Sequence, residues 1–116
     1  MHELSIATGI QAQIEEMAAA NGLIRVTSVS VAVGERRQVV GESLRMAFEA
    51  VTNGTLSEDA TLILDEVRMQ ARCRACAHAY APTLRDFRCP ACGKAEAEIT
   101  AGNDILITSL TGDTPD

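Results

Sequence analysis

Apolar residues recur at intervals of three and four along two stretches of the chain, and this spacing predicts amphipathic helices. The first stretch spans residues 4–20, with an apolar face made of Leu4, Ala7, Ile10, Ile14, Met17 and Ala18. The second spans about residues 41–52, with Leu44, Ala47, Phe48 and Val51 on one face. Asn21-Gly22 and Asn53-Gly54 follow the two stretches, and glycine after a helix favours a left-handed cap.

Three further stretches are rich in β-branched and other apolar residues and predict strands at 24–33, 61–69 and 104–110. In the first, the apolar parity changes between Val26 and Val29, so either both faces are covered or a bulge shifts the pleat. The order of helix, strand, helix, strand, strand predicts an α+β fold, with two helices on a three-stranded sheet. We expect the second and third strands to pair antiparallel.

All four cysteines lie between the last two predicted strands, at Cys73, Cys76, Cys89 and Cys92. They form two C-x2-C turns separated by twelve residues, a spacing that lets four thiolates surround one tetrahedral metal ion, as structural zinc requires. Pro90 and Gly93 help the second turn to bend. Two disulfides, four free thiols and an iron–sulfur or redox site remain as alternatives.

These assignments divide the chain into two domains. We predict an α+β domain of residues 1–70 plus 99–116, and a zinc-ribbon-like module of residues 71–98 inserted between its last two strands. Ala101-Gly102-Asn103 is expected to be the flexible connection between them.

Composition narrows the class of protein. The chain has 116 residues, of which 47% are apolar and 22% charged, which excludes a disordered, collagen-like or disulfide-dense chain. It has no long apolar run and no basic start followed by an apolar segment, so we expect no membrane partner and a cytoplasmic, thiol-reducing location. Without a Ser/His/Asp set or a glycine-rich phosphate loop, we do not expect an enzyme.

The net charge of −6 is unevenly distributed. Residues 68–94 contain six basic residues and only Asp86 as an acid, a balance of +5. The rest of the chain has four arginines and fifteen acidic residues, a balance of −11. The basic segment is either an ordinary solvated loop or a docking face for an acidic partner, and the acidic remainder argues against broad contact with nucleic acid.

The chain begins Met1-His2-Glu3, and it contains only one other histidine. A histidine at position two can offer its imidazole, its backbone amide nitrogen and the α-amino nitrogen to one metal ion, and Glu3 can add a carboxylate. Such a nitrogen-rich set suits nickel(II) or copper(II) better than zinc. On this chemistry alone, His2 as a frayed surface residue is the simpler interpretation.

The sequence resembles the HypA family of hydrogenase-maturation nickel metallochaperones over nearly its whole length. The similarity rests on the opening Met1 to Ser5, on Val33 to Glu35, on Ala47 to Glu49, on the paired C-x2-C turns and on Gly102-Asn103. The resemblance implies nickel, Ni(II), as cargo at His2, with Glu3 contributing, and structural zinc, Zn(II), at the four cysteines. Where some members carry an acidic residue linked to nickel, this chain has Val40-Gly41, so no residue is carried over there.

The resemblance also implies partners, namely a HypB-type GTPase and the large subunit of nickel–iron hydrogenase, with urease as a second possible destination. A homodimer stays open. The competing hypothesis is a zinc-ribbon adaptor that binds protein or nucleic acid through its arginines. His78, two residues after Cys76, is either a polar residue of the zinc loop or a replacement zinc ligand when a thiolate is protonated.

Overall fold

A computed structural model describes residues 2–115 of the chain. The helices are α1 (His2–Asn21) and α2 (Gly41–Thr52), with a short 3-10 turn at Glu35–Arg37. The strands are β1 (Arg25–Gly34), β2 (Thr61–Val67), β3 (Gln70–Cys73), β4 (Ala79–Tyr80), β5 (Ala97–Ala101) and β6 (Ile105–Asp113). The α+β class and both helices are therefore confirmed, and Gly22 and Gly54 have the expected positive φ after them.

The described chain forms two compact units. The first contains residues up to 31, 39–65 and from 107 onward, and the second contains residues 32–38 and 66–106. The cysteine-containing unit thus begins before and ends after the segment 71–98 assigned to the module from sequence. The assignment of nickel to one domain and zinc to the other stays a prediction.

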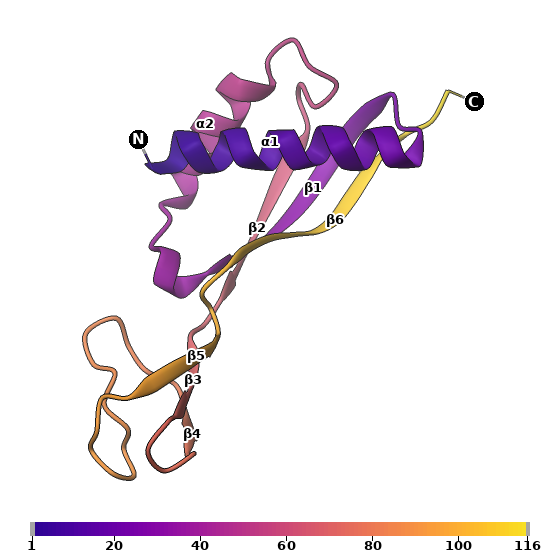
Figure 1. The fold of residues 1–116 in the computed structure, drawn as a ribbon. Helices are drawn as coiled ribbons and strands as arrows, with labels where there is room; N and C mark the ends of the chain where they lie inside the picture. Colours follow the sequence, from indigo (N-terminus) through magenta and orange to yellow (C-terminus); the bar gives the residue numbers. More distant parts are fainter. Residues whose placement is uncertain (1, 116) are drawn as a thin grey trace. The chain divides into compact units, whose positions relative to one another are not determined.

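The first unit is built around the two helices, which contact each other (Figure 1). The buried face of α1 consists of Ala7, Ile10, Gln11, Ile14 and Ala18, and that of α2 of Leu44, Phe48 and Thr52. Leu4 departs from the predicted stripe because 43% of its surface is exposed. Gln11 takes a core position that the apolar pattern did not show, and its amide donates hydrogen bonds to Glu15 and Thr55.

The main sheet has the strand order β2-β1-β6, with β1 in the centre. The expectation that the second and third predicted strands pair with each other is wrong, because β2 and β6 lie on opposite sides of β1. Burial along β1 changes parity between Val26 and Val29, as the apolar residues do. The central strand is long and apolar enough to support a neighbour on each edge, whereas β2 has only one buried residue, Leu62.

The second unit contains a smaller sheet of order β4-β3-β5. Strand β3 pairs antiparallel with both neighbours, with Ala71 opposite Tyr80 in β4 and opposite Ile99 in β5. The segments that enter and leave the cysteine loops therefore do pair antiparallel. They are β3 and β5, and not the two longer strands that the sequence predicted to pair. Ala71, Cys73, Tyr80 and Cys89 form the buried cluster of this unit.

Two glycines of the second unit lie backbone against backbone. A Cβ added to Gly34 would lie 2.4 Å from the carbonyl carbon of Gly102. The neighbouring amides of Gly34 and Arg36 donate to the carbonyls of Asp104 and Gly102, at 2.8 Å and 3.0 Å. Gly102 is therefore packed against neighbouring backbone, whereas the expected flexibility of residues 101–103 stays a prediction.

The carboxylate of Glu35, the residue after Gly34, accepts a hydrogen bond from a buried backbone group. Its Oε1 accepts a hydrogen bond from the backbone N–H of Met69 at 2.9 Å, and Met69 is fully buried. A buried backbone donor without a partner costs free energy comparable to a lost hydrogen bond, so the carboxylate stabilises the chain where it enters β3. Within residues 2–115, no helix is long and apolar enough to cross a membrane.

Candidate metal centres

The four cysteines converge on one point in the second unit. Their Sγ atoms all lie within 4.8 Å of one another, and the Cys73–Cys92 and Cys76–Cys89 pairs are each 3.6 Å apart. Thiolates bound tetrahedrally to zinc at about 2.3 Å lie roughly 3.8 Å apart, so the sulfur cluster has the size of a zinc tetrathiolate site. Among residues 2–115, no other group of three or more Cys, His, Asp or Glu residues brings its ligand atoms together in this way.

The two C-x2-C turns share one backbone pattern. The N–H of Cys73 donates to the carbonyl of His78, and the N–H of Cys89 donates to that of Lys94, each at 2.9 Å. The carbonyls of the same two cysteines accept from the N–H groups of Ala77 and Gly93, each at 2.8 Å. The turns are therefore local repeats of each other, and together they present two cysteines each to the common point.

The fifth residue of each turn has a positive φ, 64° at Ala77 and 77° at Gly93. Glycine adopts this conformation freely, whereas an alanine there pays a steric cost. Gly93 fits the sequence prediction, and Ala77 shows that the first turn takes the same conformation without glycine.

This difference predicts opposite effects for two exchanges. Ala77→Gly should stabilise the metal-loaded second unit by up to about 1 kcal/mol, and Gly93→Ala should destabilise it by about 1–2 kcal/mol. Both positions are exposed and a Cβ at Gly93 meets no atom within 4 Å, so the backbone conformation is the main difference. Denaturant unfolding of the two variants measures the effect, and equal stability of both would contradict the assignment of strain.

The pKa values of the thiols favour a bound cation. The N–H of Cys76 hydrogen-bonds to Cys73 and, with other donors, lowers the pKa of Cys73 to about 7. For Cys76, the N–H of His78 acts in the same direction, but the neighbouring sulfur of Cys89, burial and the other two sulfurs raise its pKa to about 12. Four thiolates this close repel one another, and a divalent cation removes that repulsion.

One face of the cluster is packed and the other is open. Cys73 and Cys89 are buried, whereas Cys76 and Cys92 are exposed. Tyr80 packs in the buried cluster with Cys73 and Cys89, and burial followed by the charge on Cys73 raises the pKa of its hydroxyl. The arrangement fits a structural site, because the four sulfurs fill a tetrahedral shell without leaving a position for substrate.

His78 is exposed and lies outside the group of converging ligand atoms. Its ring stacks on that of Tyr80, with centroids 6.4 Å apart and planes 5° from parallel. Its backbone, through both its N–H and its carbonyl, belongs to the first cysteine turn. The role of its imidazole as a replacement zinc ligand stays a prediction.

The predicted nickel residues lie at the start of α1. Nδ1 of His2 is 3.2 Å from Oε2 of Glu3, and the side chain of His2 is 49% exposed. The same oxygen of Glu3 accepts a hydrogen bond from the backbone N–H of Val40 at 3.3 Å. The Val40 N–H first, and then the His2 side chain, lower the pKa of Glu3, so this carboxylate is ionised at neutral pH.

Val40 is the contact that the sequence analysis missed at this end of the chain. It precedes α2, whose first turns leave backbone N–H groups without helical partners, and a carboxylate from elsewhere can accept from such a group. A hydrogen bond to a main-chain N–H is independent of the residue type, so the valine gave no signal. The α-amino group of Met1, the third predicted nickel ligand, lies outside the described residues.

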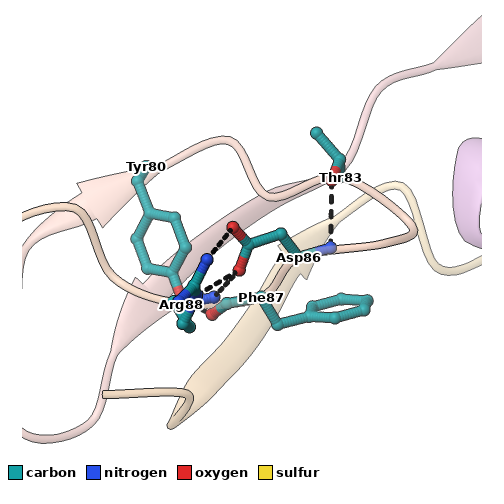
Figure 2. Close-up of polar contacts among 5 residues, drawn as sticks. All are labelled: Tyr80, Thr83, Asp86, Phe87 and Arg88. Atoms are coloured by element: carbon teal, nitrogen blue, oxygen red, sulfur yellow. Dashed lines mark hydrogen bonds and ion pairs between the residues drawn. The ribbon is translucent and has the colours of Figure 1, made fainter. Parts of the chain in front are cut away.

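The basic residues of the segment 68–94 are all exposed, but they are not equivalent: Arg68, Arg72, Arg74, Arg85, Arg88 and Lys94. Arg88 is paired with the single acid of the segment, because its Nε and Nη2 donate to the two carboxylate oxygens of Asp86 at 3.0 Å and 3.1 Å (Figure 2). The charge of Arg88 is therefore largely compensated by Asp86.

Comparison with known proteins gives consistent matches over nearly the full length of the chain. The family model described as "Hydrogenase/urease nickel incorporation, metallochaperone, hypA" matches residues 1–112. A hydrogenase maturation factor HypA of Azotobacter chroococcum is 41% identical over 110 residues, covering 95% of this chain and 97% of that protein. One from Chlorobium luteolum is 34% identical over 110 residues, covering 95% and 94%.

Solved structures agree in fold. The solution structure of the nickel metallochaperone HypA from Helicobacter pylori matches with a TM-score of 0.77 and 28% identity, covering 98% of this chain and 99% of that one. A second solution structure, of a HypA protein, matches with a TM-score of 0.72 and 30% identity, covering 97% and 96%.

Proposed function

This chain belongs to the HypA family, and we propose that it is a nickel carrier that binds Ni(II) at His2 and Glu3 and delivers it for maturation of nickel–iron hydrogenase. The observation that carries the proposal is the N-terminal pair itself. An imidazole that is half exposed lies 3.2 Å from an ionised carboxylate at the start of α1.

Binding of nickel at His2 would change the hydrogen bonds of Glu3. Oε2 of Glu3 is shared between the imidazole of His2 and the N–H of Val40. If nickel takes Nδ1 of His2, which closes a chelate ring with the backbone amide, the bond from Nδ1 to Glu3 is lost. Glu3 then either follows the metal as an oxygen ligand or stays on Val40 and holds the start of α1 in place.

We propose that the four cysteines hold one zinc ion with a structural role. Zinc supplies a cross-link between the two C-x2-C turns, and Cys73, Cys76, Cys89 and Cys92 supply its four ligands. The two buried sulfurs join this cross-link to the cluster around Tyr80. Zinc and nickel would thus occupy different units of the chain. The zinc ion would be retained, and the nickel ion would be transferred.

The proposed carrier function also includes partners and a cellular location. Its partners are a HypB-type GTPase and the hydrogenase large subunit, and urease is a second destination. Its location is the cytoplasm, where reduced cysteines remain available to zinc. The chain has no proposed catalytic role.

The nickel site is tested by calorimetric titration of the zinc-loaded chain with a native N-terminus. We expect about one nickel per chain with a micromolar constant, near −8 kcal/mol, which is tight enough to load and weak enough to release. His2→Ala should abolish this binding. One residue added before Met1 should weaken it or change its geometry, because the α-amino nitrogen is then converted to a peptide nitrogen.

His78→Ala is the matched control, because His78 is the only other histidine in the chain. It should leave nickel binding unchanged. Glu3→Gln separates the two roles of Glu3: loss of affinity together with a changed nickel absorption spectrum indicates a ligand, whereas lower affinity with the same spectrum indicates positioning. Full affinity in His2→Ala would show that the nickel site lies elsewhere.

A further inference from the structure

The loop between β4 and the second cysteine turn contains a tight hairpin. Thr83 and Asp86 bridge in antiparallel fashion, with the N–H of each donating to the carbonyl of the other at 3.0 Å and 3.2 Å. The hydroxyl of Thr83 also accepts from the N–H of Asp86 at 3.0 Å (Figure 2). Only Leu84 and Arg85 lie between the bridged residues, so they form the tip.

Side chains on both sides brace this hairpin. The carboxylate of Asp86 accepts from the guanidinium and from the backbone N–H of Arg88. These bonds fix the conformation of residues 86–88, the arm of the hairpin that follows the tip. The hydroxyl of Tyr80 donates to the carbonyl of Phe87 at 2.6 Å, which ties the arm to the cluster around the cysteines. The guanidinium of Arg36 lies 6.0 Å from the centroid of the Phe87 ring.

The tip is chemically unlike an ordinary turn. Two-residue hairpin loops favour Asn, Gly and Asp, whereas this one has a leucine that is 43% exposed and an exposed arginine. Within residues 2–115, Arg85 has no ion-pair or hydrogen-bond partner, in contrast to Arg88 nearby. An exposed apolar residue and an exposed arginine thus follow one another in a turn that is closed by hydrogen bonds.

We propose that Leu84 and Arg85 form a docking tip that binds an acidic protein surface with a small apolar recess, on the protein that receives nickel from this chain. Preorganisation lowers the ordering cost of such a contact, the leucine supplies buried area, and the arginine pairs with acidic groups at the rim. The balance of +5 over residues 68–94 favours approach to an acidic partner.

Nucleic acid fits this tip less well than protein does. Single-stranded nucleic acid is bound by exposed aromatic rings together with basic residues. In this unit the ring of Tyr80 is buried and that of Phe87 is half-buried, and the side chain presented at the tip is aliphatic. The identity of the docking partner rests on the proposed delivery function, but the exposure and bracing of the tip do not.

The test measures binding of the zinc-loaded chain to the purified large-subunit precursor of the nickel–iron hydrogenase from the same organism. We expect Leu84→Ser and Arg85→Glu each to weaken binding about tenfold or more, with Arg85→Lys retaining most of it. Leu106→Ser and Arg68→Glu are matched controls, because both residues are exposed in the same unit and distant in sequence from the tip. They should change binding by less than about twofold.

Zinc content and nickel titration are recorded for every variant, so that loss of folding and loss of cargo are seen separately. Equal binding by Leu84→Ser, Arg85→Glu and the controls would overturn the docking tip and leave the carrier function intact. A wild-type chain that binds nickel but not the precursor would overturn both docking and delivery. Binding to a random DNA duplex that Arg85→Glu abolishes, with precursor binding unchanged, would overturn the protein partner in favour of nucleic acid.

Discussion

Cys89→Ser is expected to cost the second unit its bound zinc and with it most of its tertiary structure. The substitution removes one of four thiolates and places a hydroxyl at a position that is only 1% exposed, in contact with the buried cluster. Structural zinc contributes roughly 10–16 kcal/mol of apparent binding free energy in small zinc-dependent domains, more than the core of Ala71, Tyr80 and their neighbours can replace.

Tyrosine fluorescence measures this loss in one unit only. The chain has one tyrosine and no tryptophan, and Tyr80 packs directly against the cysteine pair. Native mass spectrometry gives the zinc content, and we expect about one ion per wild-type chain and none in Cys89→Ser.

Cys92→Ser is the comparison for burial, because it removes a ligand at an exposed position. It should lose zinc similarly but resemble the chelator-treated wild type, without the added cost of a buried hydroxyl. Nickel binding at His2 should remain largely intact in both variants. Iron and visible absorption in the purified wild-type protein would contradict the zinc assignment.

Gly34→Ala is expected to destabilise the second unit strongly, although it adds a single methyl group. That group would lie 2.4 Å from the carbonyl carbon and oxygen of Gly102 and 2.8 Å from the nitrogen of Asn103. These are backbone atoms that cannot rotate away, so the two segments must separate and strain their hydrogen bonds. We expect a loss of at least about 2–3 kcal/mol, the scale of an overpacked core.

Gly9→Ala is the matched control with the opposite sign. Gly9 lies on an exposed face of α1, and its added Cβ would meet no atom within 4 Å. Alanine is favoured over glycine inside a helix by about 1 kcal/mol, so this variant should be more stable than wild type. Urea unfolding followed by circular dichroism and by Tyr80 fluorescence compares the two, and a neutral Gly34→Ala would show that the close backbone contact is absent in solution.

The sequence was sufficient where a signal depends on local spacing. Apolar residues three and four apart placed both helices within two residues of their observed bounds, because a helix buries one face whatever it packs against. The C-x2-C pairs placed four sulfurs at one point, because each short turn leaves its two cysteines little freedom. The side-by-side placement of His2 and Glu3 follows from their adjacency, whereas their role as nickel ligands stays a prediction.

Long-range pairing could not be obtained in this way. Nothing in the composition of β2 and β6 distinguishes pairing with each other from pairing with β1, since that choice depends on the whole sheet and on what covers it. The strand predicted at 61–69 ends at Val67, and a separate strand begins at Gln70. Between them, Met69 is buried and its backbone lies close to Gly102, a contact that no local pattern indicates.

The sequence by itself thus determined the α+β class, the two helices, the grouping of the cysteines and the resemblance to one family. Only the tertiary structure decided that Gly102 belongs to a packed contact, that Val40 donates to Glu3, and that Arg88 is paired while Arg85 has no polar partner within residues 2–115. The physical reason is the same in each case. These properties depend on partners that are distant in the chain, or on backbone groups that every residue carries, and neither leaves a pattern along the sequence.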